Sequence, residues 1–213
     1  MQEKKSGIVD VKSYCKELED REWALGDTLS AVIGQSYNNY TPIQMARYIS
    51  ILANGGKAVD VTLIKAITDS NGKQIPKTQI EQTVNEKLGI ENSNKLEDLN
   101  IKEENLQLIL KGMKGVTSEY GGTAYYIFSD LGMDIGGKTG SAETGEKGRV
   151  NGWFAGFAPY DDPEIAVVVL IENAGSGGNT APTAKEIIKE YFGTNANKVT
   201  EDVTAIPSTQ GVR

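Results

Sequence analysis

The sequence predicts an α+β fold in which an antiparallel β-meander is flanked by helices. Helical periodicity dominates the first half of the chain, whereas strand-like patterns dominate after Gly132. The apolar run IAVVVLI at residues 165–171 has the length of a strand and is rich in β-branched residues, which is typical of a central strand buried on both faces. Because helices and strands are segregated along the chain, a layered α+β arrangement is favoured over alternating βαβ units.

The clearest helical signal lies at residues 41–54. Thr41 and Gln44 fit a Thr-x-x-Gln capping box, Pro42 suits the first helical position, and Asn54-Gly55-Gly56 provides a stop. Earlier in the chain, only a short helix at about residues 11–18 is expected. The sequence therefore predicts one well-bounded helix before the first turn-rich segment.

The remaining elements follow from turn signals and changes of period. We expect a hairpin within residues 61–76, around Asp69-Ser70-Asn71-Gly72, then a helix at 103–116 and a shorter helix after Thr123. Strands are expected at 133–141, 150–158 and 164–173, and a terminal helix at about 180–192. Residues 1–193 then form one domain and residues 194–213 a flexible C-terminal tail.

Composition excludes several kinds of function. The 213 residues include 22 Lys and Arg against 29 Asp and Glu, a formal charge of −7 that argues against a nucleic-acid partner. There is no histidine and only one cysteine, Cys15, so Ser-His-Asp catalysis, His-ligated metals and internal disulfides are excluded. No metal or cofactor is expected, and lysine is the candidate base for any nucleophilic chemistry.

The segment with the clearest chemical content is GGKTGSAE at residues 136–143. On a strand, Lys138 and Gly140 share one face while Thr139 and Ser141 share the other. A glycine there lets a ligand backbone approach the strand edge, and unpaired edge N–H groups can bind a peptide or stabilise an oxyanion. The pattern indicates a site for an extended peptide with an anionic end.

Four segments together resemble the C-terminal part of the transpeptidase domain of class B penicillin-binding proteins. They are GDTLSAVIGQSYNNYTPIQMARYISILANGG at residues 26–56, GGKTGSAE at 136–143, NGWFAGFAP at 151–159 and PEIAVVVLIEN at 163–173. The resemblance spans about residues 22–193 and contains the third element, Lys-Thr-Gly, of the signature set of penicillin-recognising serine enzymes. It implies an incomplete domain of that β-lactamase/transpeptidase-like fold.

The resemblance also implies residue roles. Lys138 would supply positive charge, and the backbone N–H of Ser141 would be an oxyanion-hole donor, so these two are the catalytic candidates. The substrate-binding candidates are Thr139, Gly140, Ser141, Ala142 and Glu143. Trp153 and Phe154 are expected in the core or the wall of the groove.

The nucleophile of that family, the serine of Ser-x-x-Lys, is not expected in this chain. Ser13 and Ser70 each precede a lysine by three positions, and Ser36 fits Ser-x-Asn. However, Ser13 is followed by charged residues instead of an apolar helix, Ser36 lies inside the stretch that leads into Thr41-Pro42, and Ser70 lies in a turn. We therefore expect a fragment that is inactive alone, with an exposed apolar patch near the Lys138 strand that promotes self-association.

The function implied is part of a peptidoglycan D,D-transpeptidase that cross-links cell-wall stem peptides through an acyl-enzyme and binds β-lactams. Its expected partners are those peptides, β-lactams and the missing N-terminal part of the same domain. The parent protein would be anchored to the bacterial cytoplasmic membrane and act on its extracytoplasmic face. An alternative is a β-lactam or peptidoglycan sensor without turnover, and a third is a structural domain whose Lys-Thr-Gly is incidental.

Overall fold

The computed structural model describes residues 12–35, 38–58, 61, 66–76, 78–80, 82–83 and 97–193. The helices there are α1 (Lys12–Glu19), α2 (Leu25–Val32), α3 (Pro42–Ala53), α5 (Glu103–Ser118), α6 (Tyr125–Phe128) and α7 (Ala181–Tyr191), with a 3-10 turn η1 (Gly177–Thr180). The strands are β1 (Lys57–Ala58), β2 (Glu97–Asp98), β3 (Gly136–Glu143), β4 (Val150–Ala158) and β5 (Ile165–Ile171). The predicted tail at 194–213 lies outside the described residues.

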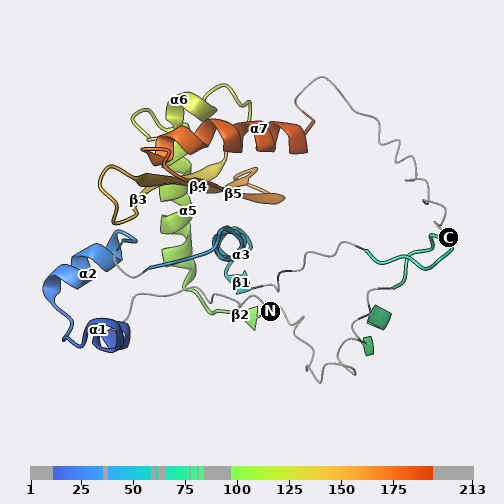
Figure 1. Ribbon diagram of the computed structural model, residues 1–213. Helices are drawn as coiled ribbons and strands as arrows, with labels where there is room; N and C mark the ends of the chain where they lie inside the picture. The colour runs from blue at the N-terminus through green and yellow to red at the C-terminus, as the bar shows by residue number, and fades with distance from the viewer. Residues whose placement is uncertain are drawn as a thin grey trace, which may run out of the picture.

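Within this part of the chain, an antiparallel sheet of order β3-β4-β5 forms the middle layer. Helices α6 and α7 cover one face, α3 lies on the other, and α5 runs past β3 from the α3 side to α6 (Figure 1). The short β1 and β2 pair with each other away from this sheet. The predicted α+β class, a meander flanked by helices, is confirmed.

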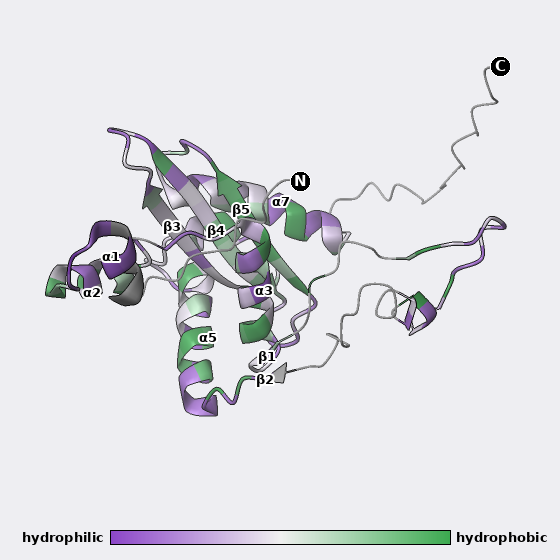
Figure 2. Cartoon of the chain, turned by 60° about the horizontal axis from the view of Figure 1, so that its bottom comes forward, coloured by the Kyte–Doolittle hydropathy of each residue, from purple (hydrophilic) through white to green (hydrophobic). Residues whose placement is uncertain are grey.

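Each face of the sheet has its own hydrophobic cluster, because successive strand residues point to opposite sides. Phe154 of β4 packs with Ile188 of α7 on one side, and Phe157 of β4 packs with Leu52 of α3 and Leu106 of α5 on the other. Figure 2 shows α5 as hydrophobic along much of its length and hydrophilic at its N-terminal end. The sheet is thus held between two helical layers.

Local signals account for the helix ends. In α3, Gln44 N donates to Thr41 Oγ1 and Thr41 N donates to Gln44 Oε1, which confirms the predicted capping box. Helix α5 begins with Glu103 and Glu104, whose charges favour a helix N-terminus, and it ends at Ser118. The predicted helix at 103–116 is therefore confirmed, with two further residues at its end.

Helix α5 fixes the position of β3. The Thr117 hydroxyl donates to the buried Ile135 carbonyl at 2.6 Å, directly before the strand begins. One turn earlier, Lys114 Nζ lies 2.7 Å from Asp134 Oδ2 and 4.6 Å from the ring centroid of Tyr160. The hydrogen bond from Lys114 lowers the pKa of the Asp134 carboxyl. These contacts tie α5 to the start of β3 and to the β4–β5 turn.

Two glycines at the start of β3 are required by aromatic rings on both faces. A Cβ at Gly136 would come within 2.4 Å of the Phe157 ring, and one at Gly137 within 2.6 Å of the Phe154 ring. Each ring therefore packs directly against strand backbone. This close packing holds the beginning of the strand at a fixed distance from β4.

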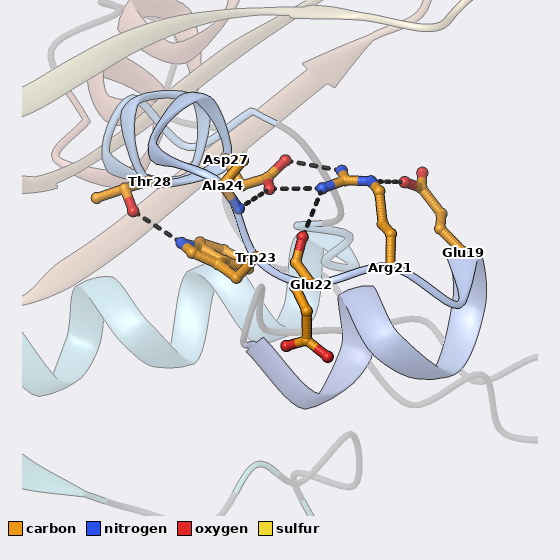
Figure 3. A network of polar contacts seen from close by, with 7 residues as sticks. All are labelled: Glu19, Arg21, Glu22, Trp23, Ala24, Asp27 and Thr28. Atoms are coloured by element: carbon orange, nitrogen blue, oxygen red, sulfur yellow. Dashed lines mark hydrogen bonds and ion pairs between the residues drawn. The ribbon is translucent and has the colours of Figure 1, made fainter.

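The α1–α2 segment is held by a polar network around Arg21 (Figure 3). The guanidinium donates to both carboxylate oxygens of Asp27, at 2.7 and 2.8 Å, and to Glu19. Asp27 also accepts from the N–H of Ala24 at 2.7 Å, which satisfies a free donor where α2 begins. These bonds, that of Arg21 foremost, lower the pKa of Asp27 to about 2. The sequence prediction identified α1 but missed α2, because α2 is two turns long and its cap depends on Arg21.

Strand prediction needed two corrections. The strand expected at 133–141 runs from Gly136 to Glu143, because residues before Gly136 make the connections to α5 described above. The run at 165–171 is not the central strand of the described sheet: β4 is central, and β5 lies at an edge. Helical layers on both sides of β5 produce the continuous apolar pattern that predicted a central position.

The predicted turn at residues 69–72 is confirmed as part of a hairpin. Thr68 and Gln74 form an antiparallel bridge, and Ile75 N donates to Ile67 O at 2.8 Å. Of the predicted range 61–76, residues 61 and 66–76 are described.

Replacing Thr117 with Val removes the hydroxyl bonded to the Ile135 carbonyl but keeps the side-chain shape. We expect the free energy of unfolding, measured by urea denaturation, to fall by about 1–3 kcal/mol, because the buried carbonyl is left without a partner. Thr183→Val, on the exposed side of α7, is the matched control and should change stability by less than about 0.5 kcal/mol. Equal stability of Thr117→Val and wild type would contradict the role given to this bond.

Candidate functional site

The site lies along the outer edge of β3. Among the described strands, β3 pairs only with β4, so its other edge is free to take a further strand. Helix α5 passes the beginning of this edge, since Thr117 contacts Ile135 and Gly137. A groove of about 990 Å³ runs beside the rest of the strand and continues between α3 and α5.

The Lys138 side chain faces this groove. Lys138 pairs across the sheet with Ala155, which belongs to the cluster on the α3 and α5 side. The side chain is exposed, and its Nζ donates to the carbonyl of Thr139 at 2.5 Å. The ammonium group therefore lies at the open edge of the strand, over a groove whose wall includes Trp153.

Thr139 and Ser141 point to the opposite face, as the predicted alternation requires. The Thr139 hydroxyl is 2.8 Å from the Thr123 hydroxyl, and the Ser141 hydroxyl accepts from Gly177 N at 3.0 Å. Thr139 is buried, whereas Ser141 is exposed. Because Ser141 accepts this bond through its oxygen, its hydroxyl proton is left to donate elsewhere.

Two hydrogen bonds establish which backbone groups of β3 point outward. The carbonyls of Thr139 and Glu143 accept from Lys138 Nζ and Gln35 Nε2, so both face away from β4. In an antiparallel strand, the N–H and C=O of one residue point to the same side, and the side alternates along the chain. Ser141 is two residues from each, so its N–H points outward into the open edge.

The loop before α7 braces the same strand from the face opposite the groove. Besides its bond to Ser141, Gly177 lies so close that a Cβ would come within 2.2 Å of the Gly140 carbonyl oxygen. The sequence did not indicate that this loop contacts the site. Only tertiary packing brings Gly177 to β3, and the same is true of Thr123 and Gln35.

The groove is continuous with an exposed apolar helix face. Leu25, Leu29, Val32 and Ile33 are 65–80% exposed and recur at helical spacing along and just after α2. Ile33 also lines the groove, where Met45, Tyr48 and Met113 contribute further apolar surface. The predicted apolar patch near the Lys138 strand is thus present.

The remaining predicted site residues lie at the end of β3. Ala142 lines the groove and is half-buried, and Glu143 is exposed and pairs with Val150 of β4. Trp153 forms groove wall and Phe154 is core, as predicted.

Of the three serines that match nucleophile motifs, only Ser70 has its side chain among the described residues. Ser70 is exposed and lies in a turn. Ser13 lies in α1, but its side chain is outside the described groups, as is the whole of Ser36. No cluster of three or more His, Cys, Asp or Glu suited to a metal ion occurs among the described residues. No helix in the same residues has the length and apolar character needed to cross a membrane.

Comparison with known proteins identifies relatives over most of the chain. Residues 5–189 match the penicillin binding protein transpeptidase domain. The chain is 31% identical to peptidoglycan D,D-transpeptidase MrdA of Haemophilus influenzae over 90% of its own length and 30% of that protein. It is 36% identical to penicillin-binding protein H of Bacillus subtilis over 68% of its own length and 20% of that protein.

Solved structures agree with these relatives. Pseudomonas aeruginosa PBP2 in complex with WCK 5153 superposes with a TM-score of 0.70 at 28% identity, over 87% of this chain and 38% of that one. The PBP2 of Helicobacter pylori in its complex with MreC shares the fold, with a TM-score of 0.66 at 23% identity, over 90% of this chain and 32% of that one. The chain thus spans between about a fifth and two fifths of the length of these relatives. By this match and by its fold, the chain belongs to the penicillin-binding protein transpeptidase domain family, in its class B branch.

Proposed function

We propose that this chain forms the Lys-Thr-Gly wall of a peptidoglycan D,D-transpeptidase site, in which stem peptides are cross-linked through an acyl-enzyme. The observation that supports this most directly is the open edge of β3, where the Lys138 ammonium and the outward N–H of Ser141 border one groove. A stem peptide or a β-lactam would bind along this edge as an added strand. Relatives such as MrdA are D,D-transpeptidases, which favours an enzyme over a sensor without turnover.

Each residue of the strand has a distinct role in this proposal. Lys138 supplies positive charge for the substrate carboxylate and for the neighbouring hydroxyls. The Ser141 N–H donates to the oxyanion of the tetrahedral intermediate, a contribution of about 3 kcal/mol in acyl-transfer enzymes. Gly140 keeps the edge clear of side chains.

The rest of the binding segment acts around these groups. The Ser141 hydroxyl, held as an acceptor by Gly177, donates its proton to the substrate carboxylate. The Thr139 hydroxyl, paired with that of Thr123, assists Ser141 in holding this carboxylate. Ala142 and Glu143 extend the strand along which the peptide lies.

The nucleophile comes, in this proposal, from another part of the transpeptidase domain that carries Ser-x-x-Lys. That part docks on the groove and on the apolar face of α2, which nothing in the described residues covers. Burying large apolar side chains contributes roughly 1.5–3 kcal/mol each.

We further propose that the parent protein is membrane-anchored and acts on the extracytoplasmic face. Protection of the domain from external protease in cells with a permeable outer barrier would contradict this location.

Incubation of this chain with a penicillin should leave its intact mass unchanged, because the chain supplies no activated serine. The measurement is mass spectrometry followed by peptide mapping. In a longer form of the protein that includes Ser-x-x-Lys, we expect a stoichiometric adduct that forms about 10²-fold more slowly, or slower still, when Lys138 is replaced by Met. An adduct on Ser13 of this chain would show that the nucleophile is already present, and equal rates for Lys138→Met and wild type would remove Lys138 from the mechanism.

Gly177→Ala should displace β3, because the new Cβ would lie 2.2 Å from the Gly140 carbonyl oxygen. We expect a loss of about 1–3 kcal/mol in stability and large amide NMR shifts at Gly140 and Ser141. Gly178→Ala is the control in the same loop, since its Cβ would meet only Ser176 Oγ at 3.6 Å. Unchanged Gly140 and Ser141 resonances in Gly177→Ala would contradict the bracing role.

Self-association through the uncovered apolar face is a further expectation for this chain alone. Wild type should elute above the monomer size on a sizing column and bind an apolar dye. Leu29→Glu combined with Val32→Glu should restore the monomer, whereas Thr183→Glu with Ser129→Glu, also exposed, should not. A monomeric wild type without dye binding would argue against this docking surface.

A further inference from the structure

We propose that three tyrosines, one just after α5 and two in α6, bind the sugar rings of a peptidoglycan strand whose stem peptide lies on β3. The tyrosine cluster consists of Tyr120, Tyr125 and Tyr126. This inference rests on the proposed function and adds to it a second contact region for the same polymer, one that recognises glycan instead of peptide.

The rings of the cluster are in mutual contact and largely exposed. Their centroids are 5.2–6.2 Å apart, and each pair meets edge to face. Tyr120 is 83% exposed and Tyr126 is 73% exposed, whereas Tyr125 is half-buried beneath them. Aromatic rings that pack against one another yet remain open to solvent offer both a stacking surface and hydroxyl groups to a ligand.

The cluster, with Tyr120 in the loop after α5 and the other two rings in α6, is held by backbone contacts. Ala124 N donates to Val116 O at 3.0 Å, and Tyr125 N donates to Gly122 O at 3.1 Å. Gly121 adopts a φ of +92°, and a Cβ at Gly122 would come within 2.4 Å of the Gly115 carbonyl oxygen. Because these contacts restrain the backbone around the rings, less conformational entropy is lost when the rings bind a ligand.

The cluster adjoins the proposed substrate strand. Thr123, in the same loop, has its hydroxyl 2.8 Å from that of Thr139 of β3. Val116, one turn before Tyr120, lines the groove. Figure 1 shows α5 running past β3 to the loop that leads into α6. The tyrosines do not line the groove itself, but a polymer that extends from β3 beyond Thr123 would reach them.

The chemistry of the cluster favours sugar over peptide. Pyranose rings present C–H faces that stack on aromatic rings and hydroxyls that exchange hydrogen bonds with phenol groups. Tyrosine hydroxyls are neutral at physiological pH, and a hydrogen bond with Tyr120 raises the pKa of Tyr126 further. The segment from Gly115 to Phe128 carries one charged residue, Glu119, and no cation for a peptide carboxylate. In the proposed function, the carboxylate of the stem peptide is instead bound by Lys138.

Co-sedimentation of the chain with purified, insoluble peptidoglycan sacculi tests this proposal. Tyr120→Ser combined with Tyr126→Ser should weaken binding about tenfold, because two stacking contacts are lost. Tyr191→Ser is the matched control, since Tyr191 is 53% exposed on α7. Tyr120→Phe with Tyr126→Phe, which keeps the rings, should retain most of the binding. A soluble disaccharide-peptide should compete better than the same stem peptide without sugar.

A parallel measurement with Lys138→Ala separates this inference from the proposed function. If Lys138→Ala weakens sedimentation and the double variant Tyr120→Ser with Tyr126→Ser does not, the sugar contact is overturned and the β3 site stands. If that double variant weakens sedimentation and Lys138→Ala does not, the β3 site fails and the sugar contact stands. If wild type does not sediment, both are overturned. Circular dichroism and the urea midpoint of each variant confirm that only folded protein is compared.

Discussion

The architecture depends on one constraint: β3 is held firmly on both faces while its outer edge stays open. The Thr117–Ile135 hydrogen bond anchors the strand at its start, and Gly136 and Gly137 allow Phe157 and Phe154 to pack against its backbone. Gly177 supports the other end from the face opposite the groove. An edge strand fixed in this way can present backbone N–H groups at a defined position, which is the requirement for stabilising a developing charge.

The alternation of side chains then separates two tasks along a single strand. Lys138 faces the groove, where an ammonium can meet a ligand, whereas Thr139 and Ser141 face the opposite layer. Those hydroxyls are bound to Thr123 and Gly177, so they fix the strand as well as border the site. The family's Lys-Thr-Gly motif in this chain therefore combines a cation that faces the groove with structural attachments one residue away.

The exposed apolar face of α2 can be interpreted as a buried contact surface of a larger domain once the family is known. An apolar helix stripe and an adjoining groove, both beside β3, form the kind of surface that domains bury instead of exposing. The relatives that share this fold are more than twice as long, so they contain further chain that could cover such a surface. The polar network around Arg21 holds α2 together without that cover.

The sequence by itself determined the fold class, the helix from the Thr41 cap to Ala53, the position of the meander, and the alternation of Lys138 and Thr139. These are local properties, set by capping, period and β-branching within a few residues. Tertiary structure alone decided that β4 is central, that β3 begins at Gly136, and that Thr123, Gly177 and Gln35 meet the Lys138 strand. Strand order and contacts across 16 to 108 residues arise from the packing of two helical layers on the sheet, and no local pattern encodes which distant segment fills each place.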